Sequence, residues 1–157
     1  MGQRLAGRLP KLVGLLARLV LGGVLLVAGA LKVTVPAVSA RAVQAFQILP
    51  FDLAGYVGYA LPVVEIAVGL LLIVGLFTRV SAVVGGLLML AFIVGIGSAW
   101  ARGLTIDCGC FGGGGTIEAT QTQYLLDILR DAGLVACAAW LLVRPRTAYS
   151  LDHRLFG

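Results

Sequence analysis

Four long apolar stretches dominate this chain, and one of them, residues 80–101, carries no charged residue. A helix needs about 20 residues to cross the roughly 30 Å hydrocarbon core of a bilayer. The stretches that reach this length are residues 12–31, 55–76, 80–101 and 121–143. Since 60% of the 157 residues are hydrophobic and only 12% are charged, the chain lacks the polar surface of a soluble protein. We predict an all-α integral membrane protein, a four-helix bundle that forms a single domain over residues 1–157.

Basic residues flank these stretches unevenly, and this bias predicts an orientation. If both termini are cytoplasmic, most of the 12 Lys and Arg residues lie on the inner side, as the positive-inside rule requires. The inner set is Arg4, Arg8, Lys11, Arg18, Arg79, Arg144, Arg146 and Arg154, and the outer set is Lys32, Arg41, Arg102 and Arg130. We therefore expect a multi-pass protein of the plasma or inner membrane. The net charge of +5 is explained by contact with membrane lipid, so no nucleic-acid partner is expected.

The segments before and after the first apolar stretch each suggest a further structural feature. The basic start followed by an apolar run is also the pattern of a secretory signal peptide, although the run is long for one. Between the first two spans, residues 33–53 include a short run with apolar periodicity. This run predicts a short interfacial helix on the outer leaflet, capped by Ser39 and stopped by Pro50.

Cys108 and Cys110 follow the third span and are separated only by Gly109. A fully extended pair at this spacing holds its Cα atoms near ~7 Å, the upper limit for a disulfide, so the chain must bend between them. Gly109 has no Cβ and permits that bend. A bridge closed over one residue should be strained, and strained disulfides exchange readily. The predicted extracytoplasmic side is where disulfides persist, so the pair predicts thiol redox chemistry.

Glu65 lies near the predicted bilayer midplane, within the second span. A carboxylate at that depth costs roughly 2.5 to 3.5 kcal/mol on insertion scales, so Glu65 should be paired, protonated or directed into a polar cavity. Proton handling or contact with a cofactor is one interpretation. A hydrogen bond that only stabilises the bundle is the other.

The fourth span carries Asp127, Arg130 and Asp131 in its outer turns, at a spacing that brings the three side chains together. Arg102, at the end of the third span, is a further candidate for this group. A cation beside a cysteine lowers the pKa of the thiol and favours the reactive thiolate, so Arg130 and Arg102 are candidates for stabilising a thiolate or a cofactor. Solvated charges at a helix end are the alternative. Cys137 is expected to be a small buried hydrophobe.

A metal site is not expected. A Cys-x-Cys pair and one buried cysteine supply too few ligands, and the single histidine, His153, lies on the other side of the predicted membrane. We recognise no phosphate loop, dinucleotide fingerprint, haem-attachment motif or catalytic triad. No cofactor is assigned with certainty, and a membrane quinone is the one candidate.

Several short motifs together resemble the MauE family of methylamine-utilisation membrane proteins, within the wider DoxX-like group of four-helix membrane proteins. These are Ala28-Gly29-Ala30-Leu31-Lys32, Pro62-Val63-Val64-Glu65, Arg102-Gly103, Cys108-Gly109-Cys110-Phe111-Gly112 and Arg130-Asp131. The resemblance covers nearly the whole chain, and the Cys-Gly-Cys-Phe-Gly run is its most specific part. It implies a role in the maturation of extracytoplasmic redox proteins, such as the disulfide-rich small subunit of methylamine dehydrogenase, alongside a thioredoxin-like partner.

The leading functional hypothesis is a membrane thiol–disulfide oxidoreductase. In this hypothesis Cys108 and Cys110 cycle between dithiol and disulfide and support disulfide formation or maturation in a thioredoxin-like partner or a client redox protein. One alternative is a non-catalytic membrane subunit whose disulfide only pins the loop. Another is a quinone-binding or transport module of the DoxX type.

Overall fold

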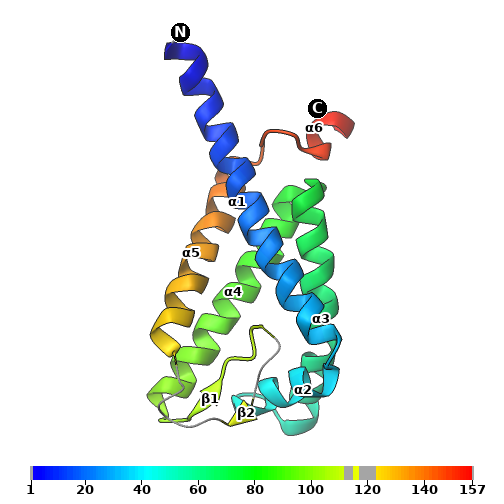
Figure 1. Cartoon of the computed structure of the whole chain (residues 1–157), viewed down its shortest axis with the longest axis vertical. Coiled ribbons are helices and arrows are strands. Elements are labelled where there is room, and N and C mark those ends of the chain that lie inside the picture. The colour runs from blue at the N-terminus through cyan, green and yellow to red at the C-terminus, as the bar shows by residue number, and fades with distance from the viewer. Residues whose placement is uncertain (1, 112–114, 117–122, 157) are drawn as a thin grey trace.

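The computed structural model describes residues 2–111, 115–116 and 123–156. Its helices are α1 (Gly2–Val33), α2 (Pro36–Ala45), α3 (Phe51–Val74), α4 (Thr78–Ala101), α5 (Tyr124–Val143) and α6 (Leu151–Leu155). Two short strands, β1 (Ile106–Asp107) and β2 (Gly115–Thr116), pair antiparallel with Ile106 opposite Thr116. Figure 1 shows the four long helices side by side, both chain ends at one end of the bundle, and α2 with the strands at the other.

Three helices, α1, α3 and α4, are long and apolar enough to cross a membrane. α5 has 20 residues but carries Asp127, Arg130 and Asp131 near its start, and it is not among these candidates. The start predicted for the fourth span, residue 121, lies outside the described residues, as does the glycine run at 112–114. The all-α membrane architecture is confirmed, with three candidate spans among the described residues where four were predicted.

The helix ends differ from the predicted spans, most of all at α1. α1 has 32 residues and a length of about 48 Å, well beyond the hydrocarbon core. Its first ten residues carry basic side chains that the hydropathy pattern excluded from the span. α3 begins at Phe51, directly after Pro50, which is the N-cap residue of the helix.

The predicted short helix between the first two spans is present as α2, but its ends differ from the prediction. Pro36 stands in the first turn, where its missing N–H costs nothing, and Val35 is the N-cap. Ser39 was expected to be the cap and instead lies inside the helix, where its Oγ donates to the Gly58 carbonyl at 2.7 Å. The helix ends at Ala45 rather than at Pro50, because Gln47 takes a positive φ of 53°. α2 is therefore anchored to α3 by a buried hydrogen bond.

One continuous apolar core joins the long helices. α1 packs along α3, and α4 packs along α5. Its large buried side chains include Leu21 and Leu25 of α1, Leu72 of α3, Met89 of α4, and Leu134 and Leu141 of α5. Small residues let these helices approach closely, which is the usual packing device in membranes.

We predict that Gly58→Ala destabilises the fold by about 1–3 kcal/mol, because an added Cβ would overlap the backbone where α2 meets α3. This Cβ would contact the Ala40 Cα and lie 2.8 Å from the Ser39 carbonyl oxygen, and neither backbone atom can move aside. Gly23→Ala is the matched control, since a Cβ there has no neighbour within 4 Å. Unfolding in mixed micelles measures both variants. Equal stability of the two would show that α2 tolerates displacement.

The segment after α5 is fixed against α1 and the α3–α4 turn. Arg18 was assigned to a cytoplasmic flank, but it is buried and donates to Thr147 Oγ1 at 2.6 Å and to the Tyr149 carbonyl at 3.2 Å. Asp152 accepts hydrogen bonds from the backbone N–H groups of Phe77 and Thr78 at 2.7 and 2.8 Å. Burial alone would raise the pKa of Asp152, but these hydrogen bonds outweigh it and lower the pKa below its ordinary value.

Candidate functional site

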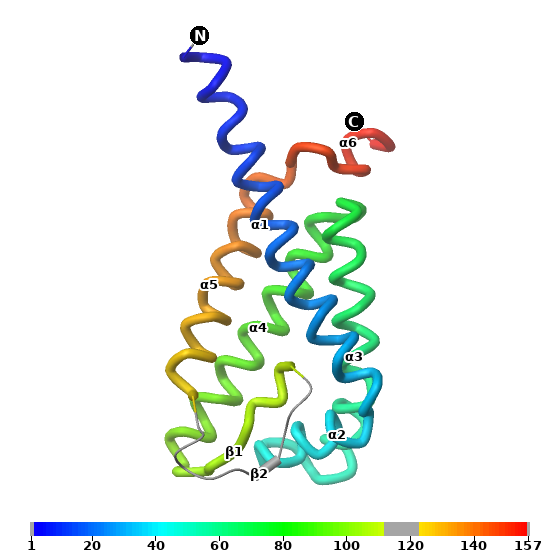
Figure 2. The backbone as a smooth tube through the Cα atoms, viewed as in Figure 1, coloured from blue at the N-terminus to red at the C-terminus, as the bar shows by residue number. Residues whose placement is uncertain are grey.

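The loop that carries the paired cysteines turns back into the bundle. Figure 2 shows the chain after β1 leaving the end of the molecule and running toward its middle. Gly109 has a φ of 68°, so the glycine supplies the bend expected between the cysteines. The Gly109 N–H donates to Asp107 Oδ1 at 3.1 Å, and the Cys110 N–H donates to Cys108 Sγ at 3.2 Å. These local bonds fix a tight turn that presents both thiols to the same side.

A tyrosine of α5 holds the start of this loop in place. The Tyr124 hydroxyl donates to the Leu104 carbonyl and accepts the Ile106 N–H at 3.0 Å. Ile106 and Tyr124 also belong to a second apolar cluster with Ile96 and Ala99 of α4. The thiol loop is thus docked on α4 and α5 by both apolar packing and hydrogen bonds.

Cys108 and Cys110 are free thiols in this structure and differ in environment. Cys108 is partly exposed, whereas Cys110 is only 5% exposed. A hydrogen bond from the Cys110 thiol lowers the pKa of Cys108. Burial and the Asp127 charge oppose this effect, and the Arg130 charge adds to it. The same hydrogen bond, followed by burial and the Cys108 charge, raises the pKa of Cys110, and Arg130 only partly offsets this. The pair therefore combines a thiol that ionises easily with one that resists ionisation.

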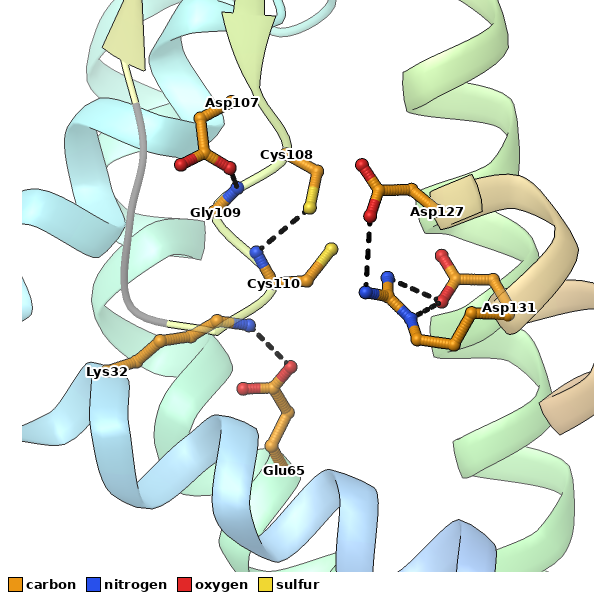
Figure 3. A network of polar contacts seen from close by, with 9 residues as sticks. Lys32, Glu65, Asp107, Cys108, Gly109, Cys110, Asp127 and Asp131 are labelled. Atoms are coloured by element: carbon orange, nitrogen blue, oxygen red, sulfur yellow. Dashed lines mark hydrogen bonds and ion pairs between the residues drawn. The ribbon is translucent and has the colours of Figure 1, made fainter. Parts of the chain in front are cut away.

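The charged cluster predicted on α5 is present beside these thiols. Arg130 pairs with Asp131, with Nη2 and Nε at 2.8 and 3.0 Å from Oδ1, and with Asp127 at 3.3 Å. Its guanidinium also stacks over the Phe111 ring, 4.9 Å from the centroid. Figure 3 shows Cys108 and Cys110 projecting from the loop toward Asp127 and Asp131. The ion pairs lie within α5, and the stacking of Arg130 on Phe111 joins α5 to the loop.

Glu65 forms a buried ion pair with Lys32 of α1. Lys32 Nζ lies 2.7 Å from Glu65 Oε1, and the two side chains are 2% and 0% exposed. The ammonium also lies 5.1 Å from the centre of the Phe92 ring, and Glu65 Oε2 has no hydrogen-bond partner among the described residues. The Lys32–Glu65 pair and the α5 carboxylates Asp127 and Asp131 are both drawn beside the loop that carries the thiols (Figure 3).

The remaining predicted residues lie elsewhere. Arg102 is exposed, and its guanidinium donates to the Phe46 and Gln47 carbonyls at the end of α2, so it does not join the thiol cluster. Cys137 packs against the core from α5, but it is only partly buried rather than buried as expected. The sequence analysis did not identify Lys32 as a site residue. Lys32 follows an apolar stretch directly, so it was interpreted as a charge that flanks the membrane on the outer side.

Comparison with known families identifies the family of this chain. A family model described as methylamine utilisation protein MauE matches residues 10–144. The chain belongs to the MauE family. The match covers α1 from residue 10 onward, α3, α4, α5, the thiol loop and the Lys32–Glu65 pair, and it ends one residue after α5. No curated protein and no solved structure matched the chain in the same comparisons. The protein is therefore a MauE-family, multi-pass membrane protein of the methylamine-utilisation type.

The unequal thiols of this MauE-family protein lead to a prediction about their reactivity. At pH 7 and in a Cys137→Ser background, Cys108 should be alkylated at least about tenfold faster than Cys110, because the thiolate is the reactive form. Its rate should reach half of its maximum below about pH 8.5, the ordinary value for cysteine. Iodoacetamide labelling of the reduced protein, followed by fragment mass spectrometry, measures both rates. Equal rates would contradict the asymmetry of the two environments.

Proposed function

We propose that this MauE-family protein exchanges thiols and disulfides with extracytoplasmic redox proteins, with Cys108 as the attacking thiol and Cys110 as the resolving thiol. The observation that carries the proposal is the pair itself. Two free thiols on one tight turn, with pKa values moved in opposite directions, lie beside the Arg130 cation. A purely structural pair would need neither the accessible, easily ionised thiol nor the charge beside it.

The proposed exchange proceeds in two steps that balance. The Cys108 thiolate attacks one sulfur of a partner disulfide, which forms a mixed disulfide and releases the other partner sulfur as a thiolate. The Cys110 thiol then loses its proton and attacks Cys108, which closes the Cys108–Cys110 disulfide and releases the partner as a dithiol. Two electrons pass to the partner. The reverse sequence oxidises a partner dithiol, and the relative reduction potentials decide the direction.

The local geometry supports the order of these roles. Cys110 is almost fully buried, so a partner meets Cys108 first. In the mixed disulfide Cys108 carries no charge, so two of the influences that raise the pKa of Cys110, its hydrogen bond to Cys108 and the Cys108 charge, are removed, while burial remains. Arg130 then favours the Cys110 thiolate at the moment when it must attack.

The proposal includes an orientation and a class of partner. α5 is a fourth crossing whose charges face the bundle interior, as intramembrane charges usually do. Both termini face the cytoplasm, and the thiol loop, which enters the bundle from its opposite end, opens to the extracytoplasmic side (Figure 1). The partners are a thioredoxin-like protein or a client redox protein of methylamine utilisation.

The test is capture of the mixed disulfide by purified Cys110→Ser protein. With an oxidised, extracytoplasmic thioredoxin-like protein as the probe, this variant should form a covalent adduct that reductant dissolves, because the resolving thiol is missing. Cys108→Ser is the matched control and should give at least about tenfold less adduct, since Cys110 is buried and ionises poorly. Both variants carry Cys137→Ser.

Two outcomes would contradict the proposal. Adduct from Cys108→Ser but not from Cys110→Ser would reverse the two roles. If neither variant forms an adduct and the double serine variant still supports disulfide formation in the client, the cysteines only stabilise the loop. The protein would then be a non-catalytic membrane subunit.

A further inference from the structure

A cavity of about 1020 Å³ lies at the end of the bundle opposite the thiol loop. Its lining includes four cations, Lys11, Arg79, Arg144 and Arg146, together with the apolar side chains of Val143 and Phe156. The cations come from α1, from the first turn of α4 and from the end of α5 with the residues that follow it. Segments far apart in the sequence thus place like charges around one cavity, although such charges repel one another.

Two smaller cavities adjoin this one and share its residues. One of about 320 Å³ is also lined by Arg79 and Arg146, and one of about 470 Å³ by Lys11 and Arg146. Arg146 therefore lines all three cavities, and His153 lines the two smaller ones. The cations surround one connected basic region centred on Arg146.

These cations have no acidic partner among the described residues. The ion pairs there are Lys32–Glu65 and those of Arg130 with Asp127 and Asp131, all around the thiol loop. Asp152 lines the 320 Å³ cavity, but its two oxygens already accept the N–H groups of Phe77 and Thr78. The cations of the cavity are thus available to bind an anionic ligand.

We infer that this cavity binds the phosphate headgroup of an anionic phospholipid. Arg79 and Arg146 carry planar guanidinium groups, which suit the bidentate recognition of phosphate. The apolar walls at Val143 and Phe156 suit the first part of the acyl chains. On the proposed orientation the cavity lies at the cytoplasmic surface, where anionic lipids concentrate and basic pockets between helices bind them.

Lipid binding by the purified full-length protein in detergent tests this inference. The probes are short-chain phosphatidylglycerol, short-chain phosphatidylcholine and inorganic phosphate. Phosphatidylglycerol should bind most tightly. Arg146→Gln should weaken this binding by about fivefold, and the Arg79→Gln/Arg146→Gln double variant by about 25-fold.

Arg154→Gln is the matched control, because Arg154 is also exposed on the same end of the chain but lines none of the three cavities. It should change the affinity by less than about twofold, as a general surface charge does. Unchanged alkylation of Cys108 confirms that each variant is folded, since the thiol loop lies at the other end of the bundle.

Three results would overturn the inference. Arg146→Gln and Arg154→Gln could weaken binding equally, which would show that lipid responds to the overall positive charge of this end and not to the cavity. Phosphatidylcholine could bind as tightly as phosphatidylglycerol, which would remove the role of charge. Inorganic phosphate could bind as tightly as the anionic lipid, which would assign the cavity to a free phosphate compound.

Discussion

Lys32→Met is expected to lower the free energy of unfolding by about 3–5 kcal/mol, because it leaves the Glu65 carboxylate buried without its counter-charge. The ion pair is 2.7 Å long, and neither side chain reaches solvent to any useful extent. Glu65 Oε2 already lacks a described partner, so no second group is placed to take over from the ammonium. Unfolding in mixed micelles measures the loss.

A matched control and a double variant separate the ion pair from other effects of the substitution. Arg41→Met removes an exposed cation of the neighbouring helix α2 and should change stability by less than about 0.5 kcal/mol. Lys32→Met/Glu65→Met replaces both charges with apolar side chains and should recover most of the loss, since buried pairs are often replaceable in this way. A double variant no more stable than Lys32→Met would contradict the ion-pair explanation.

The same double variant distinguishes the two interpretations of Glu65. If the ion pair only stabilises the bundle, a stable double variant should keep the alkylation rate of Cys108 and the yield of partner adduct. If the pair handles protons for the thiols, the variant should fold but exchange more slowly. The stability measurement and the thiol measurement therefore answer separate questions.

The sequence predicted the long helices well, because hydropathy over about 20 residues is a strong signal. It placed the ends of α4 within two residues and missed the extension of α1, whose polar first turns lie beyond the apolar stretch. The start of α2 was misplaced, because Ser39 matches the usual capping residue while Pro36 in the first turn determines the start. Local signals were correct about the presence of this helix and wrong about its ends.

Buried cations were the main error of the sequence analysis. Lys32 directly follows the apolar stretch 12–31 and Arg18 lies in its first third, and both were counted among the basic residues that flank the membrane. The structure turns both inward, Lys32 to Glu65 and Arg18 to the segment after α5. Helical periodicity gives the face on which a residue lies, but the partner on another helix follows only from the packing of the bundle.

The position of the thiol loop also depends on packing that the sequence pattern does not reveal. The Cys-Gly-Cys spacing predicted a tight turn, and Gly109 provides it. The return of the loop into the bundle had no sequence signal, because it depends on the docking of Ile106 against Tyr124. Arg102 is close to the cysteines in sequence, yet the end of α4 directs it to α2, whereas Arg130 reaches them from a distant part of the chain.

Arg130→Met is expected to change both stability and thiol chemistry, and Arg130→Lys separates the two. Arg130 holds Asp131 through two nitrogens and Asp127 through a third, and Asp131 is only 1% exposed. Without the guanidinium these carboxylates lose charged hydrogen bonds, so Arg130→Met should cost about 3 kcal/mol of stability. Lysine is a point charge that cannot reproduce the planar fork, so Arg130→Lys should be intermediate.

The thiol readout responds to charge rather than to geometry. The Arg130 charge lowers the pKa of Cys108, although the hydrogen bond from Cys110 is the larger cause. Arg130→Met should therefore raise that pKa and slow alkylation at pH 7 by about fivefold, which corresponds to roughly 1 kcal/mol of electrostatic interaction. Arg130→Lys should keep most of the rate despite its loss of stability. Equal alkylation of all three proteins across pH 6 to 9 would show that Arg130 only fastens α5 to the loop, and the electrostatic part of the proposed exchange would have to be abandoned.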